Sequence, residues 1–254
     1  MERLDSFYSE WLGCSLKDVK SGETCIVTSE LCLHREGYRV IFPFLFLCSE
    51  CRYVISVRPD LKEIISNIIH ESSDAMVLFR DDVVSSIESW CQDVIPDRLV
   101  TGLERFHALF YYVDNEHFRS FTVPECRRLT SEDQNLIEEM NKICEFGCAE
   151  ESIKDGTAFG VIIDNKIVSR SSTMPTPDAT SKYGLAWLSV ETLPEYRQRG
   201  YAKAVVSGTT ETILSRGQIS VYSHATCNKA SENTAKALGY QLYGEILRWR
   251  YSQD

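Results

Sequence analysis

The order of apolar and polar positions along the chain predicts a mixture of strands and helices. Short apolar or alternating runs are typical of strands, and apolar residues three and four apart are typical of amphipathic helices. The helix signal is clear after Pro59, where five Leu and Ile side chains share one face. Segment 103–113 carries four aromatic residues, which we interpret as core. The predicted elements of residues 1–120 are strands at 24–28, 38–47, 53–57 and 77–79 and helices at 61–70 and 83–91.

The second half of the chain predicts the order β-α-β-β-β-α-β-α-β. Thr130 followed by acidic residues is typical of a helix start. Asp164-Asn165 is a turn dipeptide between two apolar runs and predicts a hairpin. Gly217 and Gly239 are placed to end helices. The predicted elements are strands at 126–129, 158–163, 166–173, 183–192, 219–222, 240–242 and 246–249 and helices at 131–144, 200–216 and 228–238.

A polar and charged stretch at 114–121 predicts a domain boundary. The length of 254 residues accommodates one large domain or two modest ones. We therefore expect an N-terminal α/β domain at 1–120, which contains no recognisable chemical motif, and a second domain at 121–254.

Charge and hydropathy narrow the classes of partner. The net charge of −10 argues against a nucleic-acid partner, because phosphate binding needs a basic surface. Most of the negative charge lies in residues 1–120, with 12 Lys/Arg against 20 Asp/Glu. The longest apolar run, 40–48, is far shorter than the roughly 20 residues of a membrane helix. The first residues contain no apolar run of the secretory type, so we expect a cytoplasmic protein without a membrane partner.

The ten cysteines are expected to be reduced, and most to be small buried hydrophobic residues. Cys48-Ser49-Glu50-Cys51 is a lone CxxC, and a structural zinc site needs a second pair. Cys144 and Cys148 could supply that pair. Buried or incidental thiols are the interpretation we favour, and no metal is expected.

A strand, the hexapeptide Arg197-Gln198-Arg199-Gly200-Tyr201-Ala202 and a helix follow one another in the second half. Gly200 permits a positive φ and the close approach of a ligand. The first N–H groups of the helix have no partner within it and face an anion with the positive end of the helix dipole behind them. Arg197, Arg199 and Lys203 add positive charge. An ordinary strand-to-helix turn with surface arginines fits the hexapeptide alone equally well.

The hexapeptide resembles the (Gln/Arg)-x-x-Gly-x-(Gly/Ala) motif of the GNAT superfamily of N-acetyltransferases. Downstream, Asn228-Lys229-Ala230-Ser231 with Ala235 and Leu238-Gly239-Tyr240 resembles the second motif of that family, one helix and one strand later. The resemblance covers about 121–254, and Glu191-Thr192 with Asn228-x-x-Ser231 is closest to a bacterial branch with an extra N-terminal domain. It implies a mixed, mostly antiparallel central sheet flanked by helices. Residues 1–120 would then be a degenerate copy of the same fold or a domain for substrate or partner.

The resemblance implies acetyl-CoA as co-substrate and places it on named residues. In this family the strand before the turn splays from its neighbour and binds the pantetheine arm through its backbone, while the turn holds the pyrophosphate. The alternative for Asn228 and Ser231 is a helix cap and a surface serine. The positions carried over as cofactor-binding are Val190, Glu191, Thr192, Arg197, Gln198, Arg199, Gly200, Tyr201, Ala202, Asn228 and Ser231.

The implied reaction is the attack of an amine on the thioester, which benefits from a general base. Glu191 and His224 are the candidate catalytic residues; the alternatives are a solvated carboxylate and a structural histidine. Tyr183 and Tyr222 could line the pocket or simply belong to the core. The chain departs from the family at Ala235, where many members carry a tyrosine that protonates the thiolate. Ser231, a water molecule or no acid at all could serve instead.

Two functions follow from the resemblance. The first is an N-acetyltransferase that moves an acetyl group from acetyl-CoA to a primary amine of a small molecule or peptide. The second, kept open by Ala235, is a non-catalytic acyl-CoA-binding or interaction module with the same fold. A homodimer is compatible with both. A nucleotide-phosphate binder unrelated to CoA would leave the helix that begins at Asn228 unexplained.

Overall fold

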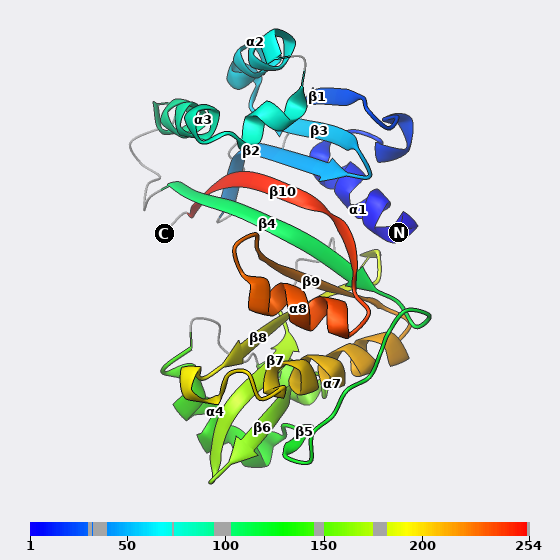
Figure 1. Cartoon of the computed structure of the whole chain (residues 1–254), viewed down its shortest axis with the longest axis vertical. Helices are drawn as coiled ribbons and strands as arrows, with labels where there is room; N and C mark the ends of the chain where they lie inside the picture. The colour runs from blue at the N-terminus through cyan, green and yellow to red at the C-terminus, as the bar shows by residue number, and fades with distance from the viewer. Residues whose placement is uncertain are drawn as a thin grey trace. The chain divides into compact units, whose positions relative to one another are not determined.

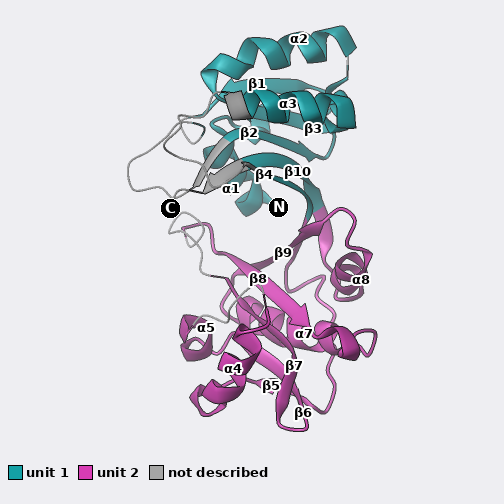
Figure 2. Cartoon of the chain, turned by 90° about the vertical axis from the view of Figure 1, so that its left-hand side faces the viewer, with its two compact units in different colours: residues 1–109, 243–254 teal, residues 110–242 magenta. Residues whose placement is uncertain are grey.

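The computed structural model describes residues 1–29, 32, 40–72, 74–93, 103–144, 150–174 and 182–252 (Figure 1). The chain divides into two compact units, coloured separately in Figure 2. Unit 1 comprises residues 1–109 and 243–254, and unit 2 comprises residues 110–242. The last strand of the chain thus groups mainly with the N-terminal unit. The predicted domain boundary at 120 stays a prediction.

Unit 1 contains helices on a sheet whose described strands run in the order β1-β3-β2-β10-β4. β1 and β3 are parallel, whereas β3 with β2 and β2 with β10 are antiparallel. In Figure 2, α2 and α3 lie beside one another over the strands β1, β3 and β2. The helices are α1 (Glu2–Leu12), α2 (Lys62–Ser72) and α3 (Asp81–Asp93), and the strands are β1 (Thr24–Thr28), β2 (Val40–Ser49), β3 (Arg52–Val57), β4 (Leu103–Val113) and β10 (Gln241–Ser252).

The hairpin β2–β3 turns on the CxxC segment. Ser49 pairs with Arg52, and Glu50 and Cys51 between them have φ values of 50° and 58°. Two residues with positive φ are what a two-residue hairpin turn with the right-handed twist of its strands requires. The spacer of the CxxC therefore forms a turn, and Cys51 is exposed.

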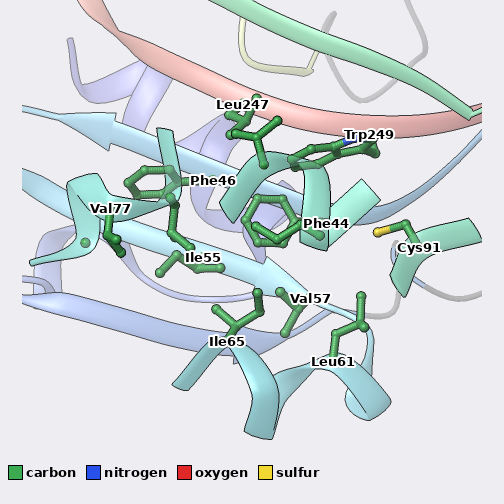
Figure 3. Packing of buried hydrophobic residues seen from close by; sticks show 14 residues of the cluster. Phe44, Phe46, Ile55, Val57, Leu61, Ile65, Val77, Cys91, Leu247 and Trp249 are labelled. Carbon is green, nitrogen blue, oxygen red and sulfur yellow. The ribbon is translucent and has the colours of Figure 1, made fainter. Parts of the chain in front are cut away.

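The core of unit 1 lies between this sheet and its helices. Phe44 and Trp249 pack edge to face with ring centroids 5.1 Å apart, and both are fully buried. Figure 3 shows Leu247 and Trp249 of β10 over the side chains of β2, β3 and α2. A strand that comes from the far end of the sequence thus completes the core of the N-terminal unit.

Helix α1 contacts β10 of the same unit through an aromatic stack and a hydrogen bond. Tyr8 stacks on Tyr243 with centroids 5.2 Å apart, and the Tyr243 hydroxyl donates to Asp5 at 2.9 Å. The Arg52 guanidinium lies 3.4 Å from the same carboxylate. Burial and the Asp5 carboxylate raise the pKa of Tyr243.

Unit 2 has its strands in the order β9-β8-β7-β6-β5. Neighbouring strands from β5 to β8 pair antiparallel. Helix α7 connects β8 to β9 in the chain, and these two strands pair parallel. The strands are β5 (Cys126–Arg128), β6 (Phe159–Ile163), β7 (Lys166–Thr173), β8 (Leu185–Thr192) and β9 (Ile219–Ala225), and the helices are α4 (Gln134–Asn141), α5 (Glu150–Lys154), α7 (Tyr201–Ser215) and α8 (Lys229–Ala237).

A β-bulge in β7 decides which side chains face α4. Ile162 pairs with Ile167 and Val161 pairs with Ser169, so Val168 is an extra residue on β7. Ile167 packs in the cluster with α4, and Val168 packs with Val205 of α7. A bulge of one residue shifts the alternation of the strand. Arg170 therefore faces α4, where its guanidinium hydrogen-bonds the side chain of Asn141.

After residue 121 the structure has the predicted elements in the predicted order, with one further helix, α5, that was not predicted. The two-residue turn at Asp164-Asn165 is present, with φ values of 47° and 58°. Two local predictions were wrong, and one helix of unit 1 was missed. The strand predicted at 77–79 is a 3-10 helix, Ala75–Phe79, because the Asp74 carboxylate accepts from the Met76 N–H and starts a helical turn. The two final strands are one strand, β10. Helix α1 was not predicted at all.

The fold class is confirmed as mixed α/β with mostly antiparallel strands flanked by helices. No helix in the described part of the chain combines the length and the apolar character that crossing a bilayer requires.

Candidate functional site

The predicted phosphate turn has the geometry of an open helix N-terminus. Gly200 is the N-cap of α7 with φ 82° and ψ 0°, a left-handed conformation that favours glycine. The first backbone hydrogen bond of the helix is donated by the N–H of Ala204 to the carbonyl of Gly200. No side chain caps α7, so the N–H groups of residues 201–203 are directed out of its positive end.

The basic residues around the turn have distinct positions. Arg197 donates from Nε to the carbonyl of Thr192 at 3.2 Å. Arg199 donates to the carbonyl of Glu195 and lies over the ring of Tyr196. Lys203 holds its Nζ 3.7 Å from the ring centroid of Phe121. Three cationic side chains thus surround the start of α7.

Strand β8 separates from β9 before the turn. The parallel register runs only from Leu185 opposite Ile219 to Trp187 opposite Val221. β8 continues to Thr192 and β9 continues to Ala225, so among the described residues the last five positions of β8 have no partner on β9. The predicted splay is therefore present in the backbone.

The hydrogen-bond parity of β8 shows which residues face the gap. Trp187 accepts from Met174 and Leu193 donates to Val168, both toward the β7 side. Backbone groups alternate in direction along an antiparallel strand. Val190 and Thr192 consequently direct their N–H and C=O groups toward β9, whereas the backbone of Glu191 faces β7.

The side chain of Glu191 lies on the α4 face of the sheet. Glu191 is the cross-strand partner of Arg170, whose exposure is only 3%. Its Oε2 atom is buried without a hydrogen-bond partner among the described residues. Burial, and secondarily the Glu191 carboxylate, raise the pKa of the Cys144 thiol to about 11. Glu191, Arg170 and Cys144 thus form one cluster at the end of α4.

His224 is buried at the end of β9, with 6% exposure. Its ring stacks on Tyr111 at 5.4 Å and meets Tyr222 edge to face at 6.2 Å. Nδ1 lies 2.9 Å from the carbonyl of Ala225, and Nε2 is buried without a partner in the described structure. An imidazole that donates from Nδ1 leaves Nε2 as an acceptor. The environment is that of a buried aromatic cluster with one unmet acceptor.

Asn228 caps α8 by accepting the N–H of Ser231 on Oδ1 at 3.1 Å. Asn228 therefore has the capping role that was the alternative to cofactor contact. The cap uses only the amide oxygen of Asn228. Burial raises the pKa of Tyr222.

Sequence reasoning missed Arg170. The signal for Arg170 is present in β7, where Ser169-Arg170-Ser171-Ser172 is a polar run in an interior strand. All four residues are buried, and polar residues are uncommon at buried positions.

The other candidate sites lie apart from these residues. Two cavities of about 370 and 280 Å³ in unit 2 are not lined by any predicted site residue. Across the described ranges, no group of three or more His, Cys, Asp and Glu side chains could hold a metal ion. Cys148 of the hypothetical zinc site lies outside the described residues.

Residues 179–249 match the model of the family described as FR47-like protein. Over these residues the chain resembles a GNAT-related family. The match covers the phosphate turn and the second motif, and it confirms the predicted resemblance. A comparison with curated proteins finds no match.

Solved structures similar to the chain include several acetyltransferases. A putative GNAT-family acetyltransferase from Novosphingobium aromaticivorans is 21% identical, with 63% of this chain and 72% of that chain covered at a TM-score of 0.48. A GNAT-family acetyltransferase from Colwellia psychrerythraea is 15% identical, with 66% of this chain and 62% of that chain covered at a TM-score of 0.46. A GCN5-related N-acetyltransferase from Sphaerobacter thermophilus is 13% identical, with 80% of this chain and 73% of that chain covered at a TM-score of 0.46.

Proposed function

We propose that unit 2 binds acetyl-CoA and transfers its acetyl group to a primary amine of a small molecule or peptide. The observation that carries the proposal is the separation of β8 from β9 directly before the uncapped start of α7. Open backbone groups on a strand edge suit the amides of a pantetheine arm. The adjoining helix N-terminus suits a pyrophosphate.

The cofactor would contact the chain in two places. Val190 and Thr192 face the gap and would bind the pantetheine arm, with the carbonyl of Thr192 shared with Arg197. The amides that follow Gly200 would hold the pyrophosphate, with Arg197, Arg199 and Lys203 supplying positive charge. Asn228 would reach the arm with the amide nitrogen that its cap leaves over.

In the reaction, the amine nitrogen attacks the thioester carbonyl carbon, a C–N bond forms, and the C–S bond breaks. Glu191 is the proposed base, because its Oε2 is buried without a hydrogen-bond partner among the described residues and can accept a proton. His224 stays the second candidate, with Nε2 as the acceptor.

The cofactor site is tested by thermal-shift titration with acetyl-CoA, longer acyl-CoAs and CoA on the wild type and on Gly200→Glu. A ligand at about 100 times its Kd adds about 2.7 kcal/mol to the free energy of unfolding. We expect a clear shift for the wild type. Gly200→Glu places a carboxylate in the anion site and should abolish the shift.

Gly217→Glu is the matched control. Gly217 lies at the other end of α7 with φ 70°, close to the 82° of Gly200, so both variants carry a similar backbone strain. A Cβ at Gly217 meets nothing within 4 Å, and a Cβ at Gly200 meets only Phe121 at 3.4 Å. An unchanged ligand shift in Gly200→Glu would remove the proposed site.

The second candidate is the non-catalytic acyl-CoA-binding module, which the fully buried Ala235 favours because that position supplies no proton. The two functions are separated by mass-spectrometric detection of CoA release from acetyl-CoA. Polyamines, aminoglycosides and amino acids form the panel of acceptors. Binding without turnover across the panel supports the module.

A further inference from the structure

Segment 114–121, which follows β4, is hydrogen-bonded to both helices of the candidate site. The N–H of Arg119 donates to the carbonyl of Leu238, the C-cap of α8, at 3.0 Å. Two residues on, the N–H of Phe121 donates to Oγ of Ser207 in the second turn of α7, at 2.8 Å. The segment that the sequence predicts as a domain boundary therefore holds Phe121 against the first half of α7.

The ring of Phe121 contacts both the phosphate turn and a neighbouring cation. Nζ of Lys203 lies 3.7 Å from the ring centroid, well inside the roughly 6 Å within which a ring face attracts an ammonium. A Cβ built on Gly200 would lie 3.4 Å from Cε1 and Cζ of the same ring. One half-buried ring thus spans the N-cap of α7 and the ammonium of the third residue of that helix.

The three cations of the turn are held in different ways. Arg197 and Arg199 each donate to a backbone carbonyl, of Thr192 and Glu195 respectively. Lys203 is held by a ring face instead. An ammonium has three N–H donors, and a ring face engages it from one side only. Lys203 can therefore keep its contact with the ring while it donates to a phosphate oxygen.

We propose that Phe121 is a positioning residue of the anion site and acts through Lys203. Its ring holds the ammonium beside the N-terminus of α7 before the ligand arrives, so that less side-chain entropy is lost on binding. The inference rests on the proposed function for the identity of the ligand, and the chemical group that Lys203 meets is a phosphate or pyrophosphate. Phe121 lies outside residues 179–249, which match the family model.

A second ring on α7 offers a matched comparison. Phe159 of β6 also packs on this helix, where its ring fills the space beside Gly208. It lines the same cavity of about 280 Å³ as Phe121. The cation over the Phe159 ring is Arg128 of β5, with Cζ 5.7 Å from the centroid. Loss of the Phe159 ring should thus disturb the packing of α7 without removing the contact of Lys203.

The role of Phe121 is tested on the full chain by calorimetric titration with three probes. CoA carries both halves of the ligand, inorganic pyrophosphate carries only the anion, and pantetheine carries only the arm. We expect Phe121→Leu to weaken the binding of CoA and pyrophosphate about two- to fivefold, the range of a partly exposed cation–π contact, and to leave pantetheine unchanged. Phe121→Tyr keeps a ring and should restore both affinities. Phe159→Leu should leave all three unchanged.

A double-variant cycle shows whether Phe121 acts through Lys203. Lys203→Met removes the ammonium, so adding Phe121→Leu should weaken pyrophosphate binding no further. Losses that multiply in the double variant would mean that Phe121 acts independently of Lys203, and they would overturn the inference. An equal loss for pantetheine and CoA in Phe121→Leu would mean a general distortion of the site, and it would overturn the inference as well.

The inference and the proposed function fail separately. If CoA binds the wild type and Phe121→Leu equally well, the inference falls and the proposed function stands. If CoA does not bind but pyrophosphate binds and depends on Phe121, the proposed function falls and the role of Phe121 stands. If neither CoA nor pyrophosphate binds the wild type, both fall.

Discussion

At the scale of single residues, the chemistry of unit 2 depends on polar groups placed on a buried strand face. Arg170 is 3% exposed and Glu191 is its cross-strand partner, and a buried charge is stable only beside an opposite charge or good hydrogen-bond partners. Asn141 supplies one such partner for Arg170. The Glu191 carboxylate is thus held in a polar cluster at the end of α4 rather than on a solvated surface.

Glu191→Gln should lower the rate of acetyl transfer by about 10²–10⁴-fold near neutral pH, because the amine then loses its proton acceptor. The loss should shrink as the pH approaches the pKa of the amine, where the free base is abundant without help. The measurement is kcat/KM against pH with an amine from the acceptor panel.

Glu195→Gln is the control, because Glu195 is an exposed carboxylate four residues along, 3.7 Å from Lys166. A Glu191→Gln variant that matches the wild type at every pH would remove Glu191 as the base.

At the scale of elements, the ends of strands and helices carry the function and part of the stability. Helix α7 begins without a side-chain cap, whereas the 3-10 turn before α4 begins with a capping box of Thr130 and Asp133. The Asp133 carboxylate also accepts two hydrogen bonds from Arg127, at 2.6 and 2.8 Å. An end that is satisfied internally stabilises the fold, and an end that is left open remains available for an anion.

Asp133→Asn should lower the free energy of unfolding by about 1.5–3 kcal/mol at pH 7, the range for hydrogen bonds to charged groups. The hydrogen bonds from Arg127, with those from Thr130, hold the pKa of Asp133 below its ordinary value. A lowered folded pKa gives stability that is present above about pH 4, the unfolded value, and is lost as the pH falls through the folded pKa. The two proteins should therefore converge in acid.

Urea unfolding from pH 7 down to pH 2 measures this difference. Glu132→Gln, one residue away and exposed, should show a much smaller effect. A difference between Asp133→Asn and wild type that stays constant with pH would contradict the assigned role of the carboxylate.

At the scale of the whole molecule, unit 1 is built from two segments that lie far apart in the sequence. The chain leaves unit 1 within β4, forms unit 2, and returns to unit 1 with β10. β10 pairs with β2 and places Leu247 and Trp249 in the cluster with Phe44 (Figure 3). Unit 1 therefore needs both ends of the sequence.

A fragment of residues 1–120 should fail to form a native core, because it lacks β10 and exposes one edge of β2. Loss of a buried Trp alone costs about 3–5 kcal/mol, a large share of the stability of a small domain. Near-ultraviolet circular dichroism of the fragment should lack the signal of packed aromatic rings. Joining residues 1–109 to 243–254 by a short glycine-serine linker should restore the aromatic signal. The two segments are already close, because Nε2 of His107 lies 2.6 Å from Oε1 of Glu245. A folded fragment 1–120 would contradict this account.

The extent to which the sequence predicted the fold follows from how local each signal is. The helix that begins after Gly200, the turn at Asp164-Asn165 and the ends at Gly217 and Gly239 depend on a few neighbouring residues, and the structure has them all. The 3-10 helix at Ala75–Phe79 was misjudged because an apolar run of three residues carries no period of its own. Helix α1 was missed although its apolar residues follow a helical spacing.

The candidate site divides in the same way. The sequence by itself determined the open turn at Gly200 and the positions of Glu191 and Ser231, because a glycine, a strand and a helix start are written in adjacent residues. Only the tertiary structure decided that β8 leaves β9 after Trp187 and that Arg170 lies beside Glu191. The register between strands, the bulge at Val168 and the return of β10 are set by packing between segments far apart in the chain. Such contacts depend on the combined burial of many side chains, and no stretch of neighbouring residues encodes them.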